Sequence, residues 1–160
     1  MIDNLKNFVT KTNFRTQCLL IYHYEEKGKS MVLASRKSPK SKVPDNVKAE
    51  VETKANELVE SFLKPEYVKP PPEDMRFNYV VDIYTKWYRN YFYFCAKYAC
   101  PSPEAISPFF ETKFARMEYV GKGLFNLSYM RHTGSWFEIF QNLSVDECLE
   151  VMKDLPHFQP

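Results

Sequence analysis

Five apolar segments of strand length follow one another between residues 77 and 140. They cover residues 77–84, 91–98, 113–120, 124–131 and 136–140. Three of the four connections between them are short turns, and the fourth is a proline-rich loop over 101–108. Such connections suit antiparallel neighbours, because a parallel pair needs a longer crossover. The chain is therefore predicted to form an antiparallel β-meander of about five strands.

A single helical stripe precedes these segments, over residues 44–63. Its apolar members are Val47, Val51, Ala55, Leu58, Val59 and Phe62, whose spacings of four, four, three, one and three place them on one helical face. Pro44 and Asp45 suit the start of a helix, and Pro65 is expected to end it because proline has no N–H. We expect this long amphipathic helix to pack on one face of the sheet.

Two smaller elements complete the predicted α+β fold. Residues 17–35 have the pattern of an N-terminal β-hairpin, with Gly28 in its turn. Ser144 and Glu147 have the spacing of a capping box, which predicts a short C-terminal helix over residues 144–155. We expect one domain over 1–160, in which 1–42 form a basic hairpin and linker and 43–160 form the core.

The charge of the chain is balanced overall but divided along its length. The 22 lysines and arginines nearly match the 20 acids, which excludes a histone-like protein or an acidic tail protein. Residues 1–43 hold nine basic residues against three acids, whereas residues 44–160 hold 13 against 17. The hydrophobic fraction of 44% excludes global disorder, and only four glycines argue against a Gly-rich phosphate loop.

The expected location is the cytoplasm, with no association with membranes. No apolar stretch approaches about 18 residues, the length of a bilayer span. The first residues lack the apolar core of a signal peptide. Cys18, Cys95, Cys100 and Cys148 have no metal-ligand spacing, so we expect free thiols, no metal and no cofactor.

Three stretches of the chain look familiar. They are 43–52 (VPDNVKAEVE), 114–120 (FARMEYV), and 124–131 (LFNLSYMR) followed by 136–139 (WFEI). Residues 43–158 resemble a small bacterial family known as domain of unknown function 3024. The resemblance implies a fold and a bacterial or phage-borne cytoplasmic protein, but no activity. Phe125 and Phe137 depart from the family pattern, in which tryptophan and histidine are common at those places.

Aromatic residues are concentrated in residues 77–98, which hold ten of them. Because strand side chains alternate between faces, rings must lie on both sides of the sheet. One side packs on the helix. The other is covered by the N-terminal hairpin or a second subunit, or it presents rings beside Arg89, Lys97 and Arg116.

Two hypotheses follow for a chain with no assembled catalytic motif. The favoured one is a non-catalytic interaction module whose partner is another protein or a second copy of the chain. The alternative is a nucleic-acid-binding protein, in which basic residues contact phosphates and rings stack on bases. Its candidate residues are Arg36, Lys37, Lys40, Lys42, Arg89, Tyr91 and Tyr93.

A third hypothesis is a Mg²⁺-dependent nuclease. Asp82 and Glu111 would hold the metal, and Lys113 would stabilise charge at the attacking water. The Glu-x-Lys spacing of Glu111 and Lys113 also occurs at Glu52 and Lys54, on a helical and solvent-facing surface. The pattern is therefore a weak indication of this chemistry.

Overall fold

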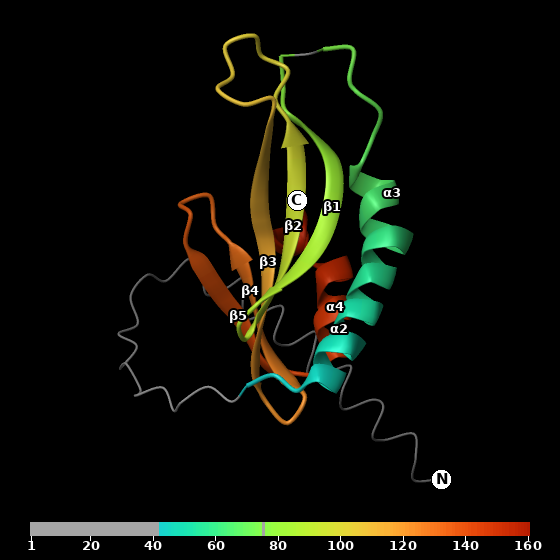
Figure 1. The fold of residues 1–160 in the computed structure, drawn as a ribbon, viewed down its shortest axis with the longest axis vertical. Helices are drawn as coiled ribbons and strands as arrows, with labels where there is room; N and C mark the ends of the chain where they lie inside the picture. The colour runs from blue at the N-terminus through green and yellow to red at the C-terminus, as the bar shows by residue number, and fades with distance from the viewer. Residues whose placement is uncertain (1–41, 75) are drawn as a thin grey trace. The chain divides into compact units, whose positions relative to one another are not determined.

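The computed structural model describes residues 42–74 and 76–160 (Figure 1). The N-terminal hairpin expected over 17–35 lies outside these residues. The described part contains a helical segment, a five-stranded sheet and a second, shorter helix. In chain order its elements are α2 (Asp45–Leu58), η1 (Val59–Leu63), α3 (Lys64–Tyr67), β1 (Tyr79–Tyr88), β2 (Tyr91–Ala99), β3 (Phe109–Gly121), β4 (Leu124–Met130), β5 (Trp136–Leu143), α4 (Val145–Asp154) and η2 (Pro156–Phe158).

The sheet is the predicted antiparallel meander. Its strand order is β1-β2-β3-β4-β5, and each strand pairs antiparallel with the next. Tight reversals join most of the strands, and Gly123 and Gly134 adopt φ values of 74° and 77° in two of them. Glycine reaches this left-handed region without the steric cost that a Cβ would bring.

Bulges shift the alternation that the sequence predicts for two strands. Val81 is an extra residue of β1, because Val80 pairs with Tyr98 and Asp82 with Lys97. Phe114 is an extra residue of β3, and its ring centroid lies 6.2 Å from that of Phe94. Regular alternation along 113–120 would place Phe114 on the face of Arg116, but the bulge places it against a core ring instead. A β-bulge has this effect because its extra residue interrupts the two-residue period.

The predicted end of the long helix at Pro65 is wrong. The helical segment runs from Asp45 to Tyr67, and its middle part, Val59–Leu63, is a π-helix. This wider turn precedes Pro65, which then occupies the first turn of α3. A proline is tolerated there because the first turn requires no N–H donor. Pro44 is the N-cap of α2, as expected, and its carbonyl accepts from the N–H of Lys48 at 3.1 Å.

Both helices lie on one side of the sheet (Figure 1). Helix α2 packs against β1 and α4, and α4 packs against β4 and β5. The core between them consists of fully buried apolar side chains, among them Val51, Ala55, Leu63, Ile83, Phe92, Phe94, Met117, Phe125, Leu127, Met152 and Phe158. The predicted packing of the long helix on one face is confirmed.

The predicted capping box begins α4. The Oγ of Ser144 accepts from the Glu147 N–H at 3.3 Å, and the Glu147 carboxylate accepts from the Ser144 N–H at 2.8 Å. Two helix N-terminal donors are thus satisfied locally. Within the described residues, no helix combines the length and the apolar character of a bilayer span.

Candidate functional site

One row of register partners crosses the whole sheet. Lys86 pairs with Tyr93, Tyr93 with Arg116, Arg116 with Ser128, and Ser128 with Glu138. Paired residues of neighbouring strands point to the same face. The adjacent row contains Phe92 and Met117 of the core, so the row of Arg116 points away from α2 and α4. No helix of the described part of the chain covers this side.

Rings and cations alternate on this side of the sheet. The Arg116 guanidinium carbon lies 4.7 Å from the ring centroid of Tyr91 and 4.6 Å from that of Trp136. The Lys113 Nζ lies 4.6 Å from the Tyr93 centroid. Cation–π contacts of this kind contribute about 0.5–2 kcal/mol, more where water is excluded. We call this surface the aromatic–cationic face, defined by Tyr84, Lys86, Tyr91, Tyr93, Lys113, Arg116 and Trp136.

Burial controls the protonation of the two tyrosines that lie beside the lysines. Tyr93 is only 7% exposed, and this burial raises the pKa of its phenol, an effect that the nearby Arg116 charge only partly opposes. Burial also raises the pKa of Tyr84, and the neighbouring Glu111 raises it further. Both phenols therefore stay neutral at physiological pH. The ionised groups of the aromatic–cationic face are its lysines and its arginine.

Two shielded polar atoms on this side, which belong to paired residues, have no hydrogen-bond partner in the described chain. They are the Nε of Arg116 and the Oγ of Ser128, and both are shielded from solvent. Ser128 is the register partner of Arg116 on the neighbouring strand. A shielded donor without an acceptor is costly, since it has given up water without gaining a bond.

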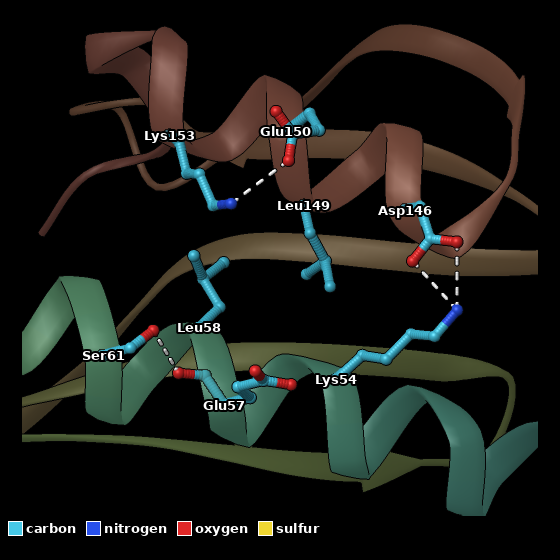
Figure 2. Close-up of a pocket in the computed structure, with 8 residues that line it drawn as sticks. All are labelled: Lys54, Glu57, Leu58, Ser61, Asp146, Leu149, Glu150 and Lys153. Atoms are coloured by element: carbon cyan, nitrogen blue, oxygen red, sulfur yellow. Dashed lines mark hydrogen bonds and ion pairs between the residues drawn. The ribbon is translucent and has the colours of Figure 1, made fainter.

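A groove of about 210 Å³ lies between α2 and α4 on the other side of the sheet (Figure 2). Leu58 and Leu149 point into it, and charged side chains surround them. The Lys54 Nζ lies 2.9 Å from an Asp146 oxygen, which links the two helices across the groove. Lys153 pairs with Glu150 at 3.1 Å. Lys54 and Asp146 thus form a bridge between the two helices, whereas Lys153 and Glu150 pair within α4.

The candidate nuclease residues make separate contacts. Asp82 Oδ1 lies 3.3 Å from the Nζ of Lys64, and Glu111 lies 3.8 Å from the Nζ of Lys86. The two carboxylates share a row of the sheet, but Lys97 on β2 stands between them. Lys113 lies on the Tyr93 ring. Across residues 42–74 and 76–160, no three His, Cys, Asp or Glu side chains are grouped as metal ligands.

The candidate nucleic-acid residues are divided by the limits of the described chain. Arg36, Lys37 and Lys40 lie outside it, and Lys42 is exposed. Arg89 lies in the β1–β2 turn, with its guanidinium carbon 5.3 Å from the exposed ring of Tyr88. The rings of Tyr91 and Tyr93 are in contact with Arg116 and Lys113. A base that stacked on either ring would compete with a cation.

Trp136, like Tyr84 and Lys86, is a member of the face that no sequence pattern assigned to a site. It begins β5, whereas Tyr91 is on β2 and Arg116 on β3, so the three meet only through the order of the strands. Alternation within β2 indicated that Tyr91 and Tyr93 share a face, and Arg116 was expected beside the rings if that face is open. No local pattern indicates that Trp136 reaches Arg116 from two strands away.

Comparison with known proteins gives one match. The model of a family described as "Domain of unknown function (DUF3024)" matches residues 43–160. No curated protein and no solved structure matches the chain. The predicted resemblance over 43–158 is confirmed by this match.

Proposed function

The chain belongs to the DUF3024 family, which is defined only as a domain of unknown function, and we propose from its geometry that it is a non-catalytic protein-interaction module. Its binding surface is the aromatic–cationic face. The observation that carries this proposal is the Arg116 guanidinium held between the rings of Tyr91 and Trp136, on the side of the sheet away from both helices.

The residue types of this surface support a protein partner. Tyrosine, tryptophan and arginine are the side chains most enriched among residues that dominate binding energy at protein interfaces. Here they stand on paired strands, and their mutual contacts already restrict their rotamers. Less conformational entropy is then lost when a partner binds.

Charge and ring contacts favour a protein over a nucleic acid. Residues 44–160 carry more acids than bases, so this part of the chain is not a general attractor of phosphates. The ring of Tyr93 is nearly buried, and Arg116 lies against that of Tyr91. Single-strand binding uses rings that bases can reach.

The test compares a variant of the aromatic–cationic face with a control variant on the side of the sheet that carries the helices. Wild type, Trp136→Ala and Lys153→Ala are used to capture partners, and any protein captured is purified and titrated against all three. We expect Trp136→Ala to weaken binding by about tenfold or more, as at interface hot spots, and Lys153→Ala to leave it unchanged. Equal binding by all three would contradict the proposed surface.

Parallel measurements separate the other hypotheses. The molecular mass of the protein, measured at several protein concentrations, shows whether a second copy of the chain is the partner. A gel-shift assay tests whether the protein binds nucleic acid. It uses single-stranded DNA, duplex DNA and RNA, with Mg²⁺ and at two salt concentrations. A salt-sensitive shift lost in Arg116→Ala would favour the nucleic-acid hypothesis. Products that disappear with EDTA and with Asp82→Asn would favour the nuclease.

A further inference from the structure

We propose that Arg116 is an anchor for a carboxylate, and that the partner presents an acidic segment to the aromatic–cationic face. This inference rests on the proposed function and specifies the chemistry of the partner. The carboxylate would accept hydrogen bonds from the Arg116 guanidinium and lie beside Lys113.

The first argument is the way Arg116 is held. Its guanidinium carbon is within 4.7 Å of two ring centroids, on β2 and on β5. A guanidinium confined between rings has its planar set of N–H donors already oriented. Such a set matches the two oxygens of a carboxylate, and charge-assisted pairs of this kind are roughly twice as strong as neutral hydrogen bonds.

The second argument is unbalanced charge. Arg116 and Lys113 form no ion pair with a carboxylate of the described residues, whereas Lys86 has Glu111 at 3.8 Å. Glu138, at the far end of the row of Arg116, accepts from Asn126 at 3.1 Å and from Gln141 at 2.6 Å. Neither cation thus has an ion pair with a described carboxylate, although Glu118 lies two residues beyond Arg116 on the same face, and a partner carboxylate supplies such a pair.

The third argument is the pair of shielded polar atoms. The Nε of Arg116 and the Oγ of Ser128 lie on paired residues and have no hydrogen-bond partner among the described residues. A carboxylate offers two oxygens with about four acceptor positions. Because both polar atoms are shielded, the side chains around them must shift for a carboxylate to reach Nε. The indole of Trp136 is partly exposed and touches the guanidinium, so it borders the place where the carboxylate binds.

The charges around the site favour a peptide carboxylate over a phosphate. Glu111 lies on the same side of the sheet as Lys113, and Glu118 and Glu138 lie on the side of Arg116. These acids repel a phosphate dianion more strongly than a singly charged carboxylate. A carboxylate group therefore fits this surface better than a phosphate group.

The experiment titrates the full chain with an acetylated, amidated hexaglutamate peptide, and with hexaglutamine as the uncharged control. The readouts are the NMR signal of the Arg116 Nε–H and the fluorescence of Trp136 in a Trp87→Phe background. We expect hexaglutamate to shift both signals and hexaglutamine to shift neither. Arg116→Gln should weaken the binding about tenfold, and Arg116→Lys should weaken it less, because the charge remains but the planar donors are lost.

Arg131→Gln is the matched control, since Arg131 also lies over a ring, 4.7 Å from the Phe137 centroid, but outside the aromatic–cationic face. It should leave hexaglutamate binding unchanged. If Arg116→Gln does not fold, as judged by far-UV circular dichroism, Lys113→Gln replaces it and should weaken binding several-fold. The affinity for hexaglutamate should fall only when the removed charge lies on the aromatic–cationic face. Removal of a positive charge elsewhere should not lower it.

Several results would overturn the inference. They are equal binding of hexaglutamine, unchanged binding by both Arg116→Gln and Lys113→Gln, equal loss in Arg131→Gln, or tighter binding of inorganic phosphate or oligothymidylate. If a protein partner depends on Trp136 while hexaglutamate does not bind, the proposed function stands and the carboxylate anchor is wrong. If neither partner binding nor hexaglutamate binding depends on the aromatic–cationic face, the proposed function and the carboxylate anchor are both wrong.

Discussion

At the scale of single residues, burial decides both packing and ionisation in this chain. Phe125 is fully buried on β4, and its ring centroid lies 5.4 Å from that of its register partner Tyr119. Cys95 and Cys148 are fully buried thiols, while Cys100, just beyond β2, is partly exposed. Cys95 thus belongs to the sheet core, and Cys100 lies in the loop that follows β2.

Phe125→Ala should lower the free energy of unfolding by about 3–5 kcal/mol, because it removes a fully buried ring from a packed core. Urea unfolding followed by circular dichroism measures the change. Phe137→Ala is the control, since Phe137 is exposed and its loss should cost about 1 kcal/mol or less. Similar values for the two variants would contradict the placement of Phe125.

The protein should lose stability as the pH rises above about 9. Burial raises the pKa of Cys148 above the ordinary thiol value of 9.0, and burial likewise raises the pKa values of Tyr93 and Tyr98 above 10.0. The unfolded chain then releases these protons first, so folding is favoured below the ordinary pKa and progressively less above it. Urea unfolding at pH 7, 9 and 10.5 measures this loss.

Cys148→Ala provides the control for this pH dependence. In that variant the part of the loss that begins near pH 9 should become smaller. A free energy of unfolding that stays constant or rises between pH 7 and pH 10.5 would contradict the burial of these groups.

At the scale of elements, local signals set the ends of some helices and tertiary context sets others. The start of α2 at Pro44 and the capping box of α4 follow from adjacent residues. The continuation past Pro65 does not, because it depends on a π-turn over Val59–Leu63. Leu63 and Val59 are buried there, so packing against the sheet stabilises a helix that proline alone would end.

Ser144→Ala should lower the free energy of unfolding by about 1 kcal/mol, because it removes the side-chain acceptor of the capping box. Urea unfolding measures the loss. Ser61→Ala is the matched control: Ser61 Oγ donates to the Glu57 carbonyl at 2.6 Å, a bond that the helix does not need. An equal loss in the two variants would show that the cap contributes nothing specific.

At the scale of the whole described part, the sheet and both helices share one core. The two tryptophans lie on opposite edges of the sheet, Trp87 on β1 and Trp136 on β5. Helix α2 packs on β1, α4 packs on β4 and β5, and the helices pack on each other. Loss of either edge should therefore destabilise the other.

The single-tryptophan variants Trp87→Phe and Trp136→Phe should each unfold in urea in one transition. Within each variant, the fluorescence midpoint should coincide with the midpoint from far-UV circular dichroism, because one core links both edges to the helices. A fluorescence transition at clearly lower urea than the circular dichroism transition would indicate that one edge opens independently.

The sequence alone determined the five strands, the antiparallel sense of their short connections, the long helix and the capping box of α4. These features depend on periods of two or 3.6 residues and on caps and turns formed by adjacent residues. It also placed Tyr91 and Tyr93 on one side of the sheet, since alternation within a strand is a local property.

Only the tertiary structure decided which side chains meet. Trp136 reaches Arg116 through the order of the strands, Asp82 pairs with Lys64 because the long helix continues beside β1, and Phe114 turns to the core at a bulge. Each contact joins residues far apart in the chain, or depends on one extra residue in a strand. No local period encodes such contacts, because they result from the packing of all the elements together.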